Sequence, residues 1–252
     1  MGKNKLQKFK DLEEFPHVFQ LRYSDIMDGK EFAQKGNWQT FFCNDHPIVL
    51  ELGCGRGEYT VGLAEKFPEK NFIGIDMKGA RLWAGAKVAI SKQLPNVAFV
   101  RTNIELLPHF FATDEVSEIW LTFPDPQMKK RNKRLTSTRM MECYQQVLRP
   151  EGSVHLKTDS AFLFTYTKAM AGLNQLPIVS ELEDVDLVAT SGHILAIRTY
   201  YEQQWMARGI AIKYLHFLLR RPHQWYEPEI LIPLDEYRSY GRSKRSSLHL
   251  TV

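Results

Sequence analysis

The sequence predicts an α/β fold with a doubly wound, mostly parallel sheet. Two observations support this prediction. Short apolar runs recur along the chain, and the segments between them carry apolar residues every three or four positions. Such an alternation of strands and helices is typical of a parallel sheet covered by helices on both faces. The length of 252 residues and the hydrophobic fraction of 44% suit one large packed core. A Rossmann-like sheet is therefore expected.

Each element of this alternation can be placed on the chain. The apolar runs are predicted as strands over 48–52, 71–76, 97–100, 118–123 and 153–157. The segments between and after them are predicted as helices, with Pro or Gly near their ends, over 58–67, 80–94, 137–148 and 161–173. The pattern changes after residue 175, and the runs 178–188 and 210–219 are expected to close the sheet as an antiparallel strand pair.

The chain is expected to hold one domain with two appendages. Residues 45–220 form the main domain, and aromatic residues such as Trp38 and Phe41 suggest that the N-terminal segment 1–44 packs on or flanks it. Residues 221–252 contain three prolines and have a Ser/Arg-rich end, so they are predicted to wrap around the domain or dangle from it as a basic tail.

Charge and cysteine content exclude several protein classes. The net charge is only +4, and the three cysteines form no CxxC pair, which argues against a disulfide framework or a structural metal site. No apolar run approaches the length of a membrane span, and no export signal is visible. We therefore expect a cytoplasmic protein without a membrane partner, present as a monomer or homodimer.

Basic residues gather in three runs that lack acidic residues. These runs are Lys3–Lys10, Lys129–Arg134 and Arg238–Arg245. The two terminal runs are interpreted as solvated, mobile tails. The internal run follows the fourth predicted strand, where ligands of this fold bind, and it therefore has a second interpretation.

A glycine-rich loop follows the first predicted strand. Gly53, Gly55 and Gly57 stand where the backbone approaches a ligand closely, although a turn with a purely structural role is the alternative. A dinucleotide-binding loop would carry a glycine where this chain has Glu58. Carboxylates at Glu51 and Glu58 would repel a pyrophosphate but not a ligand that carries an ammonium and a sulfonium group.

Two further polar residues end the next strands. Asp76 closes the second strand, where an acidic side chain accepts both ribose hydroxyls in this fold. Asn103 follows the third strand and could hydrogen-bond an adenine amino group. Together with the glycine loop, these residues favour S-adenosylmethionine over NAD as the cofactor.

The fourth predicted strand ends in a Phe-Pro-Asp-Pro string. Prolines on both sides restrict the backbone around Asp125, which holds its carboxylate at the crevice where the cofactor's methyl group would face its acceptor. Five cations follow within Lys129–Arg134, and such a purely basic run beside the crevice favours contact with phosphates. A solvated surface is the alternative interpretation.

At this point the chain resembles the bacterial tRNA (guanine-N7)-methyltransferase family, one of the class I S-adenosylmethionine-dependent methyltransferases. The string FPDP with its basic cluster carries the resemblance, together with ELGCGRG and GID upstream. The resemblance covers about residues 45–220. It extends to HLKTD at 155–159, which is similar to the family's ending of strand five, and to TYYE at 199–202, which is similar to its Thr-x-Phe/Tyr-Glu motif.

The resemblance implies a class I methyltransferase fold, S-adenosyl-L-methionine as cofactor and tRNA as partner. It implies cofactor contacts, beside the loop glycines Gly53, Gly55 and Gly57, from Glu51, Asp76, Asn103 and Asp125. It assigns to the substrate site Lys129, Asp159, Thr199 and Glu202. The rest of the basic cluster is expected to contact tRNA phosphates: Lys130, Arg131, Lys133 and Arg134.

The chain departs from the family's pattern at a few positions. The family usually continues FPDP with Trp and then Pro or His, whereas this chain has Gln127-Met128. Asn132 and Leu135 replace a His and a second Arg, and Asn103 replaces a commonly found Asp. These differences bear on how the tRNA is positioned more than on the reaction.

The chemistry of guanine N7 simplifies the expected mechanism. N7 carries an in-plane lone pair and no proton, so methylation to 7-methylguanosine needs neither a general base nor a metal. The purine becomes cationic, and a preorganised carboxylate can stabilise it. Asp125 is the first candidate for that catalytic role, and Asp159 or Glu202 could accept the N1 and N2 protons of guanine.

Two other functions stay open. One is methylation of an amine on another substrate, although such enzymes that act on nucleobases commonly show Asp/Asn-Pro-Pro-aromatic after strand four. The other is an RNA-binding module that holds the cofactor without activity. Tyr200 or Tyr201 could stack on a base that is splayed out of its helix, although packing is the alternative role. The target guanosine is expected in the variable loop of the tRNA.

Overall fold

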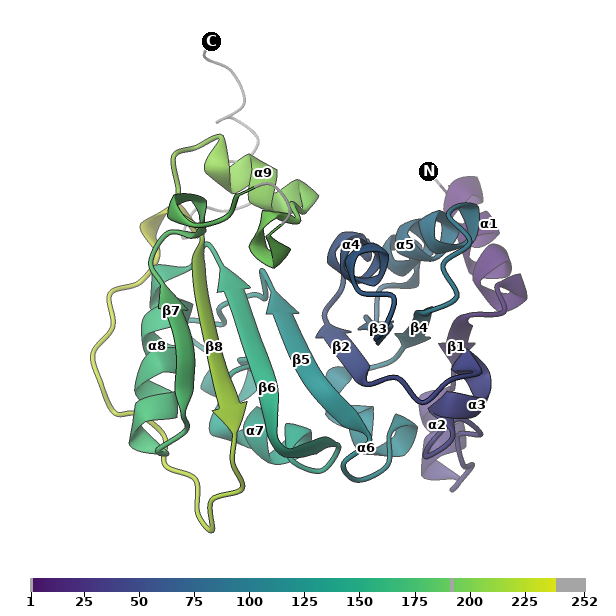
Figure 1. Ribbon diagram of the computed structural model, residues 1–252, viewed down its shortest axis with the longest axis horizontal. Helices are drawn as coiled ribbons and strands as arrows, with labels where there is room; N and C mark the ends of the chain where they lie inside the picture. Colours follow the sequence, from purple (N-terminus) through teal and green to yellow (C-terminus); the bar gives the residue numbers. More distant parts are fainter. Residues whose placement is uncertain (1, 191–192, 239–252) are drawn as a thin grey trace.

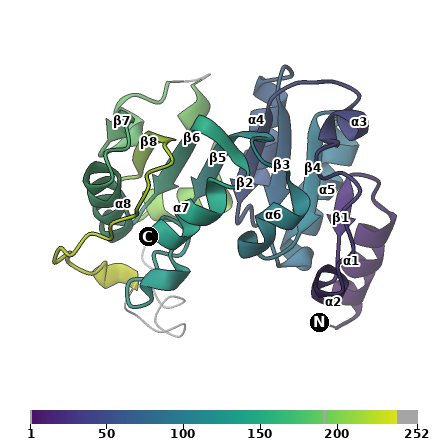
Figure 2. The ribbon, with the colours of Figure 1, turned by 90° about the horizontal axis from the view of Figure 1, so that it is seen from below.

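One sheet organises the computed structural model, which describes residues 2–190 and 193–238. Within these residues eight strands take the order β1-β4-β3-β2-β5-β6-β8-β7, with β7 and β1 at opposite edges (Figures 1 and 2). β8 runs antiparallel to β6 and β7, and the other pairs are parallel. The strands are β1 (Val18–Gln20), β2 (Ile48–Leu52), β3 (Asn71–Ile75), β4 (Val97–Arg101), β5 (Val116–Thr122), β6 (Leu148–Thr158), β7 (Ile178–Leu182) and β8 (Lys213–Leu219). The expected doubly wound α/β fold with a C-terminal antiparallel pair is confirmed.

Helices cover both faces of the sheet. They are α1 (Gly2–Glu14), α2 (Tyr23–Met27), α3 (Trp38–Phe42), α4 (Glu58–Lys66), α5 (Gly79–Ser91), α6 (Leu107–Phe110), α7 (Thr138–Tyr144), α8 (Ala161–Leu173) and α9 (Tyr200–Met206). Side chains of α1, α4 and α5 form one apolar cluster with the sheet, and those of α3, α6, α7 and α8 form the other. The central strands β2 and β3 are buried along their whole length, which explains why they are apolar without alternation.

The N-terminal segment differs from the expectation for its basic run. Lys3–Lys10 lies in α1, which packs on α5, and is not a mobile tail. Leu12 is fully buried, Trp83 of α5 donates a hydrogen bond to Asp11 (2.7 Å), and the Lys8 ammonium lies 4.5 Å from the Trp83 ring centre. Packing of an apolar stripe therefore orders a segment that its charge alone would leave in solvent.

Several strands differ from the predicted pattern in their bounds. β1 adds a three-residue strand beside β4, and β6 begins at Leu148, so α7 ends earlier than the helix predicted over 137–148. β7 ends at Leu182 and β8 begins at Lys213, inside the runs predicted to close the sheet. Pro150 and Gly152 near the start of β6 concealed the strand, since both residues are rare in strand interiors.

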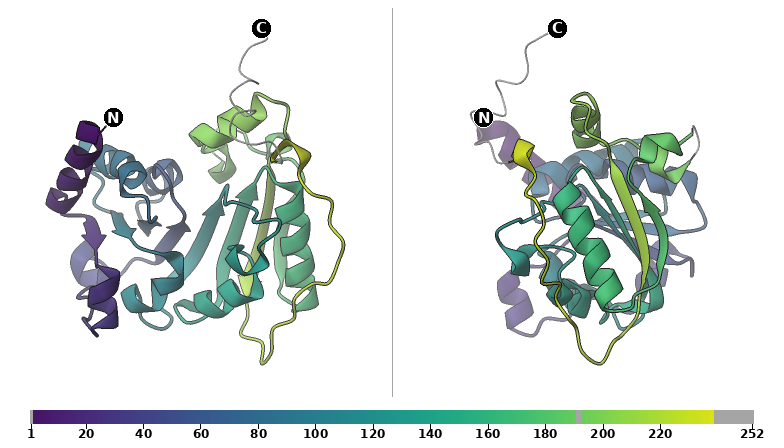
Figure 3. Two further views of the ribbon diagram at one scale, coloured as in Figure 1. Left: turned by 180° about the vertical axis from the view of Figure 1, so that it is seen from behind. Right: turned by 90° about the vertical axis from the view of Figure 1, so that its left-hand side faces the viewer.

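The segment from 220 to 238, called the strap below, runs back along α8 (Figure 3). Asn174 and Tyr226 exchange two hydrogen bonds, with Asn174 donating to the Tyr226 carbonyl (2.7 Å) and the Tyr226 amide donating to Asn174 (2.8 Å). Glu227 accepts hydrogen bonds from the Thr138 amide (3.1 Å) and the Tyr166 hydroxyl (2.6 Å). This part of the predicted tail therefore wraps around the domain. Residues 239–245 of the predicted basic run lie outside the described residues.

Candidate active site

The glycine loop between β2 and α4 adopts a backbone that glycine favours. Gly53, Gly55 and Gly57 have φ angles of 77°, 57° and 67°. A side chain at Gly57 would collide with the Phe99 ring (2.8 Å), whereas a Cβ at Gly53 would meet no atom within 4 Å. Gly57 thus allows α4 to approach the sheet, while the backbone at Gly53 faces open space that can take a cofactor.

Asp76 lies at the end of β3 and braces this loop. One carboxylate oxygen accepts a hydrogen bond from the Gly55 amide (2.9 Å) and the other accepts one from the Lys78 amide (2.6 Å). The side chain is only partly buried. The structure therefore brings together the acidic residue and the glycine loop that the sequence predicted as parts of one cofactor site.

Glu51 lies beneath the loop, in β2, and is almost completely buried. Thr60 donates to one carboxylate oxygen through its amide (2.8 Å) and its hydroxyl, and Thr122 of β5 donates to the other (2.5 Å). Burial raises the pKa of Glu51 from 4.5 to about 7 against the lowering effect of these hydrogen bonds. Glu51 thus connects α4, β2 and β5 below the predicted cofactor position.

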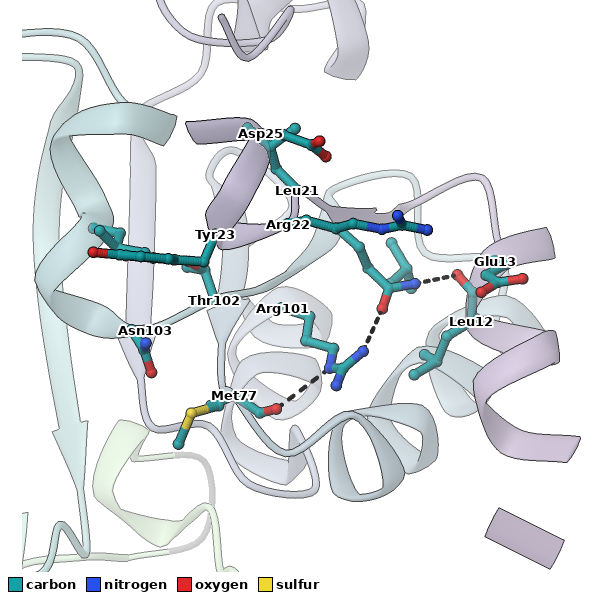
Figure 4. Close-up of a pocket in the computed structure, with 13 residues that line it drawn as sticks. Leu12, Glu13, Leu21, Arg22, Tyr23, Asp25, Met77, Arg101, Thr102 and Asn103 are labelled. Atoms are coloured by element: carbon teal, nitrogen blue, oxygen red, sulfur yellow. Dashed lines mark hydrogen bonds between the residues drawn. The ribbon is translucent and has the colours of Figure 1, made fainter. Parts of the chain in front are cut away.

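Asn103 lines a cavity of about 680 Å³ beyond the ends of β3 and β4 (Figure 4). Met77 and Thr102 contribute to the same wall, and residues of the N-terminal segment close the opposite side: Leu12, Glu13, Val18, Gln20, Leu21, Arg22, Tyr23 and Asp25. Arg101 joins the two sides by donating hydrogen bonds to Gln20 (3.0 Å) and the Met77 carbonyl (3.3 Å). This wall was not predictable from the sequence, because the N-terminal segment contains no ligand-binding motif.

The Phe-Pro-Asp-Pro loop after β5 presents Asp125 to solvent. Phe123 and Gln127 on its flanks have positive φ angles of 50° and 47°, which are rare for residues other than glycine. Gln127 donates its amide hydrogen to Asp125 (3.1 Å), and Phe123 donates its amide to the Lys157 carbonyl (2.8 Å). The backbone therefore fixes an exposed carboxylate where β5 ends next to β2 and the glycine loop.

The basic cluster divides into exposed cations and one buried arginine. The exposed ones are Lys129, Lys130, Arg131 and Lys133. Arg134 is 4% exposed, lies 4.0 Å from the Tyr166 ring centre, and donates hydrogen bonds to the carbonyls of Pro126 (3.1 Å) and Gln127 (3.2 Å). In this position Arg134 supports the Asp125 loop from inside, whereas the other four cations face solvent.

Asp159 lies just after β6 and is buried. The hydroxyl of Tyr237, in the strap, donates hydrogen bonds to its carboxylate (2.8 Å) and to its backbone carbonyl (2.9 Å). Sequence reasoning assigned Asp159 to the substrate site but missed this partner, which lies 78 positions later in the chain.

Thr199 and Glu202 cap the N-terminus of α9. The Thr199 hydroxyl accepts from the Glu202 amide (3.1 Å) and Glu202 reaches back to the Thr199 amide (3.3 Å). Glu202 has no solvent exposure and pairs with Lys157 (2.7 Å) and Arg198 (2.5 Å). Both residues therefore hold α9 in place, and both carboxylate oxygens of Glu202 already have partners within the protein.

Lys157 was not predicted as part of the site. Its ammonium group also donates to the carbonyls of Leu195 (2.8 Å) and Ile197 (3.0 Å), and burial lowers its pKa from 10.5 to about 8 despite the neighbouring Glu202. A signal was present, because a lysine inside an apolar strand requires a buried partner.

Helix α9 lies above the carboxyl ends of β5 and β6 (Figure 1) and reaches across to α4. The Tyr200 amide donates to Glu58 (3.0 Å), and the Tyr200 and Tyr201 rings lie 5.6 Å and 6.0 Å from the guanidinium groups of Arg56 and Arg81. Both tyrosines are partly exposed. Among the described residues, no group of three or more His, Cys, Asp or Glu could hold a metal, and no helix there is long and apolar enough to span a membrane.

Comparison with known proteins agrees with this geometry. A family model described as "Putative methyltransferase" matches residues 45–215. The tRNA (guanine-N(7)-)-methyltransferase of Bacteroides thetaiotaomicron is 59% identical over 98% of both chains. The protein of that name from Porphyromonas gingivalis is 58% identical over 93% of this chain and 98% of its own, and that from Listeria innocua is 34% identical over 80% and 90%.

Solved structures support the fold. The 16S rRNA methyltransferase KamB matches with a TM-score of 0.59 at 15% identity, over 76% of this chain and 95% of its own. A 16S rRNA (adenine(1408)-N(1))-methyltransferase variant from Catenulisporales acidiphilia, with its cosubstrate SAM, matches with a TM-score of 0.51 at 15% identity over 76% and 93%. At these identities the likeness concerns the fold alone, which is that of class I methyltransferases. The family model and the close relatives together show that this chain belongs to the tRNA (guanine-N(7)-)-methyltransferase family.

Proposed function

We propose that this chain transfers the methyl group of S-adenosyl-L-methionine to N7 of a guanosine in tRNA, forming 7-methylguanosine. The observation that carries the proposal is the meeting of two loops where β2 and β5 lie side by side: the open glycine loop and the loop that presents Asp125. Ligands of doubly wound folds bind where the strand order reverses, which here is between these strands. Membership of the family supports the same activity.

The residues at this position suit the cofactor. The Gly53–Gly57 backbone faces open space, Asp76 is held beside it, and the adjacent cavity of about 680 Å³ exposes the Asn103 amide. Asp76 is proposed to bind the ribose hydroxyls and Asn103 the adenine, whereas Glu51 acts from below by fixing Thr60 and Thr122. The sulfonium of bound S-adenosylmethionine supplies an electrophilic methyl group.

Asp125 is the proposed catalytic residue. The lone pair of N7 forms the new N–C bond while the C–S bond breaks with its electrons on sulfur, so the guanine becomes cationic. No proton is transferred at N7, and an exposed carboxylate already fixed by the loop backbone can stabilise the developing charge. Neither a general base nor a metal is required for this step.

The tRNA side of the proposal differs from the sequence expectation at Arg134 and at the two residues that cap α9, Thr199 and Glu202. Lys129, Lys130, Arg131 and Lys133 are exposed and are proposed to contact phosphates, whereas Arg134 supports the loop. Asp159 is proposed to accept the guanine N1 and N2 protons, and Glu202 to act by fixing α9. Tyr200 and Tyr201 offer a partly exposed aromatic surface for a base. We further propose a guanosine of the variable loop as the target and a cytoplasmic, monomeric or homodimeric enzyme.

The test is methyl transfer from labelled S-adenosylmethionine to unmodified total tRNA, followed by nucleoside digestion and fragment mapping. The expected product is labelled 7-methylguanosine in a variable-loop fragment. Label in another nucleoside would indicate a different methyltransferase activity. Binding of S-adenosylmethionine and tRNA without transfer would instead indicate an RNA-binding module without activity.

A further inference from the structure

We propose that Tyr237, in the strap, is a positioning residue that orients Asp159 for the target guanosine. The inference rests on the proposed function. It gives the C-terminal segment, which the sequence suggested to be a basic tail, a part in the recognition of the base.

The contacts of Tyr237 join two segments of the tRNA side. Its hydroxyl donates to the Asp159 carboxylate (2.8 Å) and to the Asp159 carbonyl (2.9 Å). Its ring meets Trp205 of α9 edge-on, with ring centres 5.4 Å apart and planes at 65°. The strap thus connects the end of β6 with the helix that carries Thr199 and Glu202.

The neighbouring residue Asp235 anchors the end of the strap. Its carboxylate accepts hydrogen bonds from the Ser160 hydroxyl (2.5 Å) and the Phe162 amide (3.0 Å) at the start of α8, and the side chain is buried. Its own amide donates to the Met128 sulfur (3.3 Å), in the loop after Asp125. The position of Tyr237 is therefore fixed by contacts to three segments of the site.

An orienting contact matters because an aspartate carboxylate turns easily. The torsion about its last bond has broad minima, so burial alone does not set the plane of the two oxygens. A guanine edge presents two parallel N–H donors, and pairing with them requires that plane to be set. A hydroxyl held on one oxygen sets it before the tRNA arrives, which lowers the cost of organising the site.

The first test compares two variants that each lose one hydroxyl from the strap. Tyr237→Phe keeps the ring that packs on Trp205, and Tyr226→Phe is the matched control because its hydroxyl contacts only Gln224 (3.3 Å) among the hydrogen bonds of the described residues. We expect Tyr237→Phe to lower kcat/KM for tRNA about tenfold, the effect of one hydrogen bond to a charged group. KM for S-adenosylmethionine and the thermal midpoint should match those of Tyr226→Phe.

A double-mutant cycle separates positioning from a general structural effect. If Tyr237 acts through Asp159, Tyr237→Phe should cause no further loss in an Asp159→Asn background. Equal kcat/KM for Tyr237→Phe and Tyr226→Phe, additive losses in the cycle, or a gain of activity would each overturn the inference while leaving the proposed function intact. Wild-type protein that forms no 7-methylguanosine would overturn both.

Discussion

Two carboxyl groups near the proposed reaction centre differ sharply in environment. Glu51 is buried under three donors from Thr60 and Thr122, whereas Asp125 is exposed and accepts one backbone hydrogen bond. The two residues therefore need different tests, since the first affects folding and the second affects the reaction.

Glu51 is expected to make the stability of the fold depend on pH. Its pKa is about 7 in the folded chain and 4.5 as the ordinary value, so the folded state binds the proton more tightly. This contribution is fully present below pH 4.5 and is lost as the pH rises through about 7. It amounts to at most about 3 kcal/mol at 1.4 kcal/mol per pH unit. Urea unfolding of the wild type and Glu51→Gln between pH 4.5 and 8 measures it.

The comparison isolates Glu51 from other titrating groups. Glutamine keeps the size of the side chain and an acceptor oxygen for the threonines, so Glu51→Gln should fold. It should lose only the part of the pH dependence of the free energy of unfolding that Glu51 contributes. If the free energy of unfolding changes with pH in the same way in wild type and variant, the carboxyl group is ionised in both the folded and the unfolded states at pH 5.

Asp125→Asn is predicted to reduce kcat about a hundredfold or more without affecting folding, because the exposed side chain contributes charge and little packing. Single-turnover methyl transfer to tRNA measures the chemical step. Asp114→Asn is the matched control, since Asp114 is an exposed aspartate before the amino end of β5. Near-normal transfer by Asp125→Asn would remove Asp125 from the mechanism.

The strand-end carboxylates were predictable, but their surroundings were not. Asp76 and Asp125 follow apolar runs, and parallel strands bring their ends to one edge, so the sequence indicates both positions. Glu202 has the same charge, yet its burial depends on Lys157, which lies 45 positions earlier in β6. Sequence motifs mark such residues without showing whether they contact a ligand or each other.

At the scale of elements, the cluster 129–134 combines two roles in six residues. Lys130 and Arg131 are exposed, so replacing either by Ala should reduce the slope of log K against log salt for tRNA binding by about one.

Arg134→Ala should leave that slope unchanged and lower the free energy of unfolding by about 2–4 kcal/mol, because three backbone acceptors lose their buried donor. Filter binding from 50 to 300 mM salt and urea unfolding distinguish the two groups. The opposite pattern would reverse the assignment.

The short elements show why the rest of the fold was not predictable. β1 has three residues, too few for a periodic signal, and its place in the sheet depends on pairing with β4 some 80 positions later. The strap contains no repeating apolar pattern, and isolated contacts such as those of Glu227 and Asp235 hold it. Long strands and helices carry their own signal, whereas these segments take their shape from partners elsewhere in the chain.

At the scale of the whole molecule, the N-terminal segment and the core share the walls of one cavity. Cofactor binding between Tyr23 and Asn103 should therefore slow amide hydrogen exchange in residues 18–25 and 101–106. S-adenosylmethionine at a hundred times its Kd stabilises the bound state by about 2.7 kcal/mol. Amide exchange should therefore become about a hundredfold slower wherever opening exposes the cavity. Strand β7 at the opposite edge serves as the internal control. Protection that misses residues 18–25 would place the cofactor away from this wall.

The strap also bears on when the protein becomes active during its own synthesis. A chain grows from its N-terminus, so the segments that form the glycine loop and the cavity leave the ribosome first. Asp235 and Tyr237 emerge after all of these segments, yet they hold Asp159 and the start of α8. A nascent chain can therefore complete its cofactor pocket before its tRNA side, because the contacts around Asp159 form only after Tyr237 has emerged.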